Sequence, residues 1–166
     1  MWIMVLPMLL LVSMAPLMML NNDAVLQRQQ QLAANVVRLI PVQHQAAVQF
    51  CRAAATNCRG GGVVEIDVST NLDPAISLQP GMLRSFWNGT RIVTYLDLNG
   101  LSQMRGNLSP GMVMGQWGKL SRTVSGGGML RGDTFRDYLG SPPVIMTRTD
   151  LDLNRAPENL PMMVGS

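Results

Sequence analysis

The sequence has 166 residues, a formal net charge of +3 and only 14% charged residues, which suits one modest domain. Its thirteen Lys and Arg residues are spread thinly, and aromatic residues make up 5% of the chain. A nucleic-acid-binding surface needs a dense basic face to neutralise phosphates. The composition therefore argues against nucleic acid as a partner.

Residues 2–20 form an apolar run in which Ser13 is the one polar residue. These nineteen residues, as a helix, would span roughly 28 Å, close to the ~30 Å hydrocarbon core of a bilayer. The run lacks the basic start of a signal peptide and a convincing small-residue cleavage site. We expect residues 1–20 to be an uncleaved transmembrane anchor in contact with the lipid bilayer. A cleaved signal peptide and a buried helix of a soluble domain are the alternatives.

Two features of the sequence give opposite indications of the orientation of this anchor in the membrane. Arg28, Arg38, Arg52 and Arg59 follow the run, and the positive-inside rule read literally would place them in the cytoplasm. The few charges of the remaining chain and its two closely spaced cysteines favour an oxidising compartment instead. We expect the domain to lie outside the cytoplasm.

Residues 21–59 are expected to form a kinked helix or linker that continues the anchor, giving one long helix whose second half packs on the domain. Pro41 lies within it and predicts a kink or break, because proline removes a backbone donor and crowds the preceding turn. Helical composition resumes from Val42 to about Ala55 and stops before the glycines at 60–62. The apolar residues recur near helical spacing: Leu26, Ala33, Val37 and Ile40.

Cys51 and Cys58 are seven residues apart. On a continuous helix their Cα atoms would lie roughly 10 Å apart, beyond the ~7 Å limit for a disulfide. A disulfide between them therefore requires the helix to end before Cys58, and we expect that arrangement; two free buried thiols are the alternative. A metal site is not expected, since only His44 could join the cysteines. His44 itself is expected at the surface or boundary, without a catalytic role.

Residues 60–155 are expected to form an extracytoplasmic α+β domain in which a small antiparallel sheet packs on the helix. Alternating or β-branched residues predict strands over 63–68, 91–96 and 144–147. A helix followed by short strands, without βαβ alternation, indicates the α+β class.

Two glycine- or proline-marked segments complete the domain. Ser109-Pro110-Gly111 opens a further unit over 112–120, and the glycines at 126–128 are expected to form a flexible turn. Residues 156–166 contain two prolines and are expected to be a flexible tail.

Trp87 and Trp117 are the aromatic residues of most interest. They are expected either to anchor the core or to form a partner interface, where tryptophan is enriched at hot spots. The glycine runs match no phosphate-binding fingerprint. We identify no catalytic, cofactor-binding or metal-binding residue, and expect a non-enzymatic protein with no cofactor and no small-molecule substrate.

The layout resembles the PilM family of the type IV thin-pilus systems of conjugative plasmids and some proteobacteria. The matching stretches are Gly62-Val63-Val64 entering a strand, Phe86-Trp87-Asn88-Gly89 ahead of 91–96, the region of Leu101, and Val113-Met114-Gly115. The resemblance implies a structural inner-membrane protein, single-pass with its domain in the periplasm. It also implies binding to other pilus-assembly proteins in the basal body or pilin-export apparatus. A minor pilin or pseudopilin is the alternative, although residues 1–20 contain neither the early Glu nor the basic leader of pilins.

Overall fold

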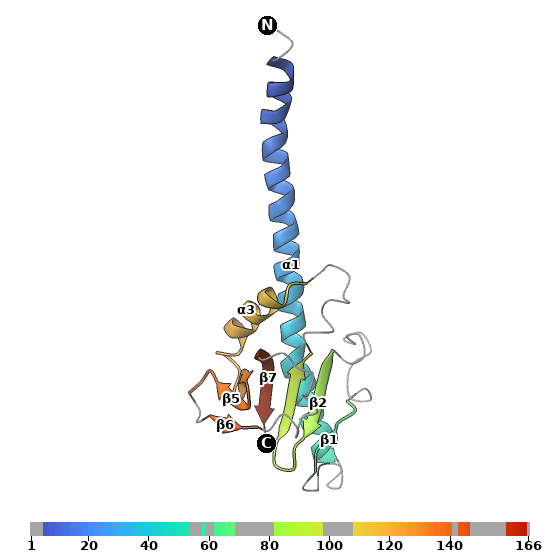
Figure 1. Cartoon of the computed structure of the whole chain (residues 1–166). Helices are drawn as coiled ribbons and strands as arrows, with labels where there is room; N and C mark the ends of the chain where they lie inside the picture. Colours follow the sequence, from blue (N-terminus) through green and yellow to red (C-terminus); the bar gives the residue numbers. More distant parts are fainter. Residues whose placement is uncertain are drawn as a thin grey trace.

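The computed structural model describes residues 5–53, 58, 62–68, 82–97, 108–140, 143–146 and 159–165, with the side chains of 5–22 and 159 left out. A long helix leads into a domain built on one antiparallel sheet (Figure 1), so the α+β class is confirmed. The elements in chain order are α1 (Val5–Ala53), β1 (Val64–Glu65), β2 (Leu83–Trp87), β3 (Ile92–Leu96), α3 (Pro110–Leu120), β4 (Gly127–Arg131), β5 (Thr134–Asp137), β6 (Val144–Ile145) and β7 (Asn159–Gly165).

The helix α1 runs without interruption through Pro41 to Ala53, so the expected long helix is present and Pro41 does not end it. A proline costs a helix about 3 kcal/mol. Here both sides of the proline are held by packing, since Ile40 is fully buried and Gln43 and His44 are nearly so. Tertiary contacts therefore maintain the helix across a residue that local propensity would use to end it.

Burial along α1 divides the helix into a free part and a packed part. The residues from Asp23 to Arg28 are all exposed, whereas buried residues recur from Ala33 onward. Figure 1 shows α1 extending from the domain on the side of its N-terminal end. Among the residues that the structure describes, no helix is long and apolar enough to cross a membrane. The anchor predicted for residues 1–20 falls where side chains are not described, so it stays a prediction.

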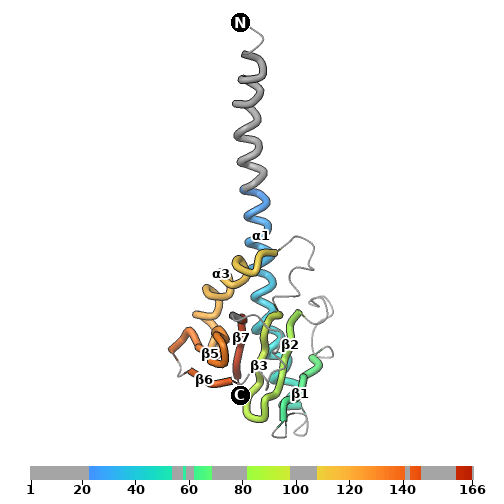
Figure 2. Tube along the Cα trace, viewed as in Figure 1, coloured from blue at the N-terminus to red at the C-terminus, as the bar shows by residue number. Residues whose placement is uncertain are grey.

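The sheet has seven strands in the order β1-β2-β3-β7-β4-β5-β6, and every neighbouring pair is antiparallel. Its central strand is β7, which lies between β3 and β4; Figure 2 shows β7 beside β3. The prediction of a flexible tail over 156–166 is therefore wrong for 159–165. Leu160 and Met162 are fully buried in the core, so this segment joins the two halves of the sheet.

Pro161 is the residue that made this segment look unlike a central strand. The hydrogen bond from Val164 N–H to the Gly126 carbonyl shows that even-numbered residues of β7 bond to β4. The nitrogen of Pro161 therefore faces the β3 side. The last pair of the β3–β7 ladder is Met162 opposite Tyr95, so Pro161 lies just beyond the end of that ladder. The missing N–H therefore interrupts neither ladder.

The glycines at 126–128 do not form a free turn, contrary to prediction. Gly127 and Gly128 are buried within β4, and Gly126 takes a left-handed φ of 77° just before it. A Cβ on Gly128 would lie 2.8 Å from the ring of Phe135 on the neighbouring strand. These glycines therefore permit close approach of β4 to its surroundings.

The face of the sheet that packs against α1, named here the helix face, is identified by its contacts. Thr94 of β3 contacts His44 of α1, and Ser85 and Met163 lie beside Thr94 on the adjacent strands. The helix α3 also packs on α1 and buries Val113 and Trp117. Segment 112–120, predicted only as a further unit, is thus a helix of the core.

Candidate functional site

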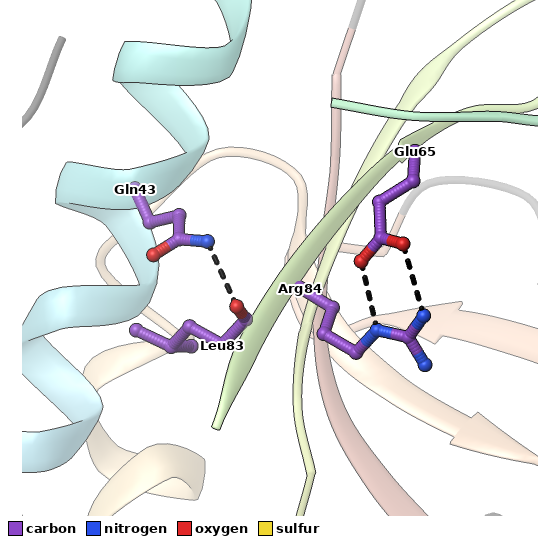
Figure 3. A network of polar contacts seen from close by, with 4 residues as sticks. All are labelled: Gln43, Glu65, Leu83 and Arg84. Carbon is purple, nitrogen blue, oxygen red and sulfur yellow. Dashed lines mark hydrogen bonds and ion pairs between the residues drawn. The ribbon is translucent and has the colours of Figure 1, made fainter. Parts of the chain in front are cut away.

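The junction between α1 and the sheet contains a group of buried polar contacts. Gln43 Nε2 donates a hydrogen bond of 3.0 Å to the Leu83 carbonyl of β2 (Figure 3). One residue further along α1, His44 Nδ1 lies 3.1 Å from Thr94 Oγ1. Thr94 Oγ1 in turn lies 2.9 Å from Ser85 Oγ. Buried polar groups that are satisfied in this way fix register and position.

His44 is 4% exposed, so the expectation of a surface or boundary residue is wrong. Its Nε2 lies against the backbone of Gly165 so closely that a Cβ on that glycine would overlap it. Burial lowers the pKa of His44 from 6.5 to about 4. The imidazole is therefore neutral at pH 7 and can both donate and accept a hydrogen bond.

The arrangement of His44, Thr94 and Ser85 superficially resembles a catalytic constellation. All three side chains are buried, with Thr94 fully so and Ser85 1% exposed. A nucleophile must reach its substrate, and these hydroxyls bond to one another inside the domain. The array therefore serves to position α1 on β3 and β2.

Cys51 and Cys58 form a disulfide, with their Cα atoms 5.3 Å apart. The helix α1 ends at Ala53, before Cys58, as a bridge at this spacing requires. Both cysteines pack against a second apolar cluster, separate from the main core. This cluster consists of buried residues Ala46, Ala47, Ile66, Val68 and Ile92, with Val48, Phe50 and Trp87 partly buried beside them. The bridge thus connects the end of α1 to the chain that leads into β1.

The two tryptophans predicted as core anchors or interface residues occupy different environments. Trp117 is fully buried in α3, and its Nε1 donates a 2.7 Å hydrogen bond to the Gly128 carbonyl. It is therefore a core anchor, and the folded domain leaves it no surface for a partner. Trp87 is only partly buried and packs on the second apolar cluster. The interface role therefore stays a prediction for Trp87.

The sheet face opposite α1 carries a stacked group of charged and aromatic side chains. Arg84 forms an ion pair with Glu65, with Nε 3.0 Å from Oε1 (Figure 3), and its guanidinium lies 4.9 Å from the centre of the Phe86 ring. Phe86 stacks on Tyr95 with ring centres 5.8 Å apart. Burial raises the pKa of Tyr95 to about 12. This group joins β1, β2 and β3 side by side.

Within the described ranges, no group of three or more His, Cys, Asp or Glu side chains could hold a metal ion. The expectations of no metal, no cofactor and no catalysis stay predictions. Comparison with protein-family models, with curated proteins and with solved structures gives no match to this chain. The geometry of the domain therefore carries the functional argument, together with the sequence resemblance.

Sequence reasoning missed the polar residues of the junction. Thr94 offered one signal, because it is the polar residue in the apolar strand of 92–96. A polar residue at the centre of a buried strand needs a hydrogen-bond partner. The sequence does not indicate that this partner is His44, fifty residues earlier in the chain.

Proposed function

We propose that this chain is a membrane-anchored structural component of a type IV pilus machine, acting by protein binding at the inner membrane. The observation that carries the proposal is the division of α1. One continuous helix, Val5–Ala53, includes most of the apolar run of residues 2–20 and also forms part of the domain core. An anchor built this way transmits its position to the domain without a flexible linker.

The fixed connection between helix and domain supports a scaffold. Gln43 and His44 bond α1 to two strands, and the disulfide closes the end of the helix onto the domain. The PilM-like stretches in the sequence point to a pilus basal body or pilin-export apparatus as the setting. The periplasm is the compartment proposed for the domain, because disulfides persist in oxidising compartments.

A minor pilin or pseudopilin is the second candidate, and exposed residues of α1 favour it. Val25 and Leu26 are 49% and 45% exposed on the part of α1 beyond the domain. In a filament these side chains would be covered by neighbouring helices. The two candidates differ in location, since a filament subunit leaves the membrane and a basal-body scaffold stays in it.

Membrane extraction tests the anchor. The full chain is expected to stay with inner membranes in alkaline carbonate. The double substitution Leu10→Arg and Leu11→Arg should release it, because each arginine at the centre of a span costs about 2.5–3.5 kcal/mol. The matched control, Gln27→Arg with Gln31→Arg, adds the same charge beyond the run and should leave the chain bound. Extraction of the unaltered chain by carbonate would refute the anchor.

Cross-linking in cells that assemble the pilus tests the role. The scaffold proposal expects basal-body or export proteins among the captured partners and expects the chain to be absent from sheared filaments. Recovery of the chain in sheared filaments would instead establish the pilin candidate. Capture of no pilus-assembly protein, with none in filaments, would reject both.

A further inference from the structure

The loop between β2 and β3 contains an Asn-Gly pair and lies at the end of the domain away from the free part of α1 (Figure 1). Asn88 N–H donates a 3.1 Å hydrogen bond to the Arg91 carbonyl, which leaves Gly89 and Thr90 as the two central residues. Gly89 takes a φ of 90°, a conformation that favours glycine. Thr90 and Arg91 are exposed. The loop is therefore a tight hairpin connection that water can reach.

The side-chain carbonyl of Asn88 accepts three hydrogen bonds. Arg91 N–H donates to Oδ1 at 2.8 Å, and Thr90 donates from both its N–H and its Oγ1 at 3.1 Å. Within the described part of the chain, neither Asn88 Nδ2 nor the Gly89 N–H has a hydrogen-bond partner. The oxygen of this amide is thus held in place, while its nitrogen and the next main-chain nitrogen are not.

This arrangement fits an intramolecular attack on the side-chain amide. When the Gly89 nitrogen adds to Asn88 Cγ, negative charge develops on Oδ1, and donors fixed around such an oxygen stabilise the tetrahedral intermediate. Here the three donors are in place before the reaction begins. Gly89 has no side chain to obstruct the approach of its nitrogen. Both reacting atoms belong to adjacent residues of one tight turn, which favours the reaction further.

We propose that Asn88 and Gly89 form a self-modification site, at which the folded chain converts Asn88 to an isoaspartyl residue. The Gly89 nitrogen loses its proton and bonds to Cγ, the Cγ–Nδ2 bond breaks, and ammonia leaves with that proton. Water then opens the resulting cyclic imide at the main-chain carbonyl carbon of Asn88. That carbon becomes a free carboxylate, and the main chain continues through Cβ and Cγ to Gly89.

The hydrogen bond from Arg91 favours this product over ordinary aspartate. In a two-residue hairpin turn, the N–H that follows the turn donates to the main-chain carbonyl that precedes it. Asn88 Oδ1 already occupies this acceptor position, and in the isoaspartyl chain it is the oxygen of a main-chain carbonyl. The product therefore retains the turn bond from Arg91 and the pairing of Trp87 with Ile92.

The conversion changes the charge at the margin of the second apolar cluster. A neutral amide is replaced by a carboxylate, which lowers the formal net charge of +3 by one. The new carboxylate lies one residue from Trp87, for which an interface role is a prediction. The reaction needs neither a membrane nor a partner, so its outcome is separate from that of the proposed pilus role.

Peptide mapping of the purified full chain in detergent tests the proposal. The folded chain and the chain unfolded in guanidinium chloride are incubated at the same pH and temperature, and conversion of Asn88 is followed by mass spectrometry. Mapping separates this site from Asn99-Gly100, the other Asn-Gly pair of the sequence. The folded chain is expected to convert Asn88 at least about tenfold faster, because the donors around Oδ1 are oriented only in the folded state. An equal or slower rate in the folded chain overturns the proposal.

Thr90 provides a matched pair of variants. Thr90→Val removes the Oγ1 donor and keeps the shape of the side chain, so it is expected to slow the conversion about fivefold. Thr90→Ser keeps the hydroxyl and should react at the rate of the unaltered chain. Conversion of Thr90→Val at the rate of the unaltered chain would show that the donors around Oδ1 do not assist the reaction, and would overturn the proposal.

The identity of the product is a readout that needs no substitution. Electron-based fragmentation of the mapped peptide distinguishes isoaspartate from aspartate at residue 88. Isoaspartate is expected as the main product from the folded chain, because its main-chain carbonyl keeps the hydrogen bond from Arg91. Aspartate as the sole product would overturn the proposal.

Discussion

His44 illustrates how one residue is constrained from several sides. It reaches Thr94 with one ring nitrogen and lies against Gly165 with the other. The contact with glycine leaves no space for a larger residue, and the burial keeps the ring neutral. A single imidazole thus connects α1 to β3 and β7. Its protonation therefore affects the free energy of unfolding of the domain.

The pKa of His44 predicts a pH dependence of unfolding. The folded pKa, about 4, lies below the ordinary value of 6.5, so the unfolded chain binds the proton more readily. Stability is therefore highest above pH 6.5 and falls as the pH decreases toward 4. The loss specific to this residue amounts to as much as about 3 kcal/mol. Urea unfolding followed by circular dichroism between pH 7 and pH 4 measures it.

The control is His44→Asn, which keeps a hydrogen-bonding side chain toward Thr94 and removes the titration. Carboxylates titrate in both proteins, so the difference between their pH profiles isolates the imidazole. Parallel profiles over this range would contradict the prediction.

At the scale of elements, the end of α1 and the start of β1 are held together by covalent and apolar contacts. The disulfide lies next to Trp87 and the second apolar cluster, while β1 itself is only two residues long. A two-residue edge strand contributes little of its own stability. Its position therefore depends on the bridge and on the burial of Ile66 and Val68.

Removing the bridge is expected to destabilise the domain. The double substitution Cys51→Ser and Cys58→Ser opens a short loop, which the chain-entropy account values at about 2 kcal/mol. Urea unfolding with and without dithiothreitol measures the change. The unaltered chain should lose stability on reduction to about the level of the double variant, which should not respond. Ala53→Ser, an exposed position beside the bridge, is the control and should behave like the unaltered chain.

At the scale of the whole molecule, the sheet depends on β7. This strand pairs with β3 over four residues and with β4 over five. The halves β1-β2-β3 and β4-β5-β6 are not adjacent without it. Leu160, Met162, Met163 and Val164 are all buried there. At about 1.5–3 kcal/mol for each buried side chain, their burial is comparable to the total stability of a domain, about 5–15 kcal/mol.

A chain that ends after Glu158 is therefore expected not to form the domain. Near-ultraviolet circular dichroism should lose the signal of the buried aromatic residues, and urea should produce no cooperative transition. Deletion of Ser166 alone is the control and should leave both measurements unchanged. A truncated chain with the unfolding midpoint of the full chain would contradict the central role of β7.

The sequence predicted what depends on local pattern. The strand expected over 91–96 corresponds to β3, and those over 63–68 and 144–147 contain β1 and β6. The long helix through Pro41 was predicted, with a bend there. The strand around Pro161 was not predicted, because tertiary packing there overrides what proline favours locally. No strand was predicted for the segment that forms β2, Leu83–Trp87.

The environments of the candidate site residues were harder to predict from the sequence than the fold. Cys51 and Cys58 could be matched because their spacing sets a geometric condition. The division between Trp117 in the core and Trp87 at its margin depends on where α3 lies, which spacing does not show.

The place of β7 has a consequence for biosynthesis. A nascent chain emerges from the ribosome in sequence order, at about 5–20 residues per second. The six other strands of the sheet all precede β7 in the sequence. Until β7 has been synthesised, β3 and β4 therefore lack the strand that pairs with both, and their apolar side chains are exposed. A growing chain in this condition is a substrate for holding chaperones. If the chain is translocated across a membrane before residue 159 has been synthesised, the domain is still unfolded. An unfolded chain is the form that a narrow translocation channel accepts.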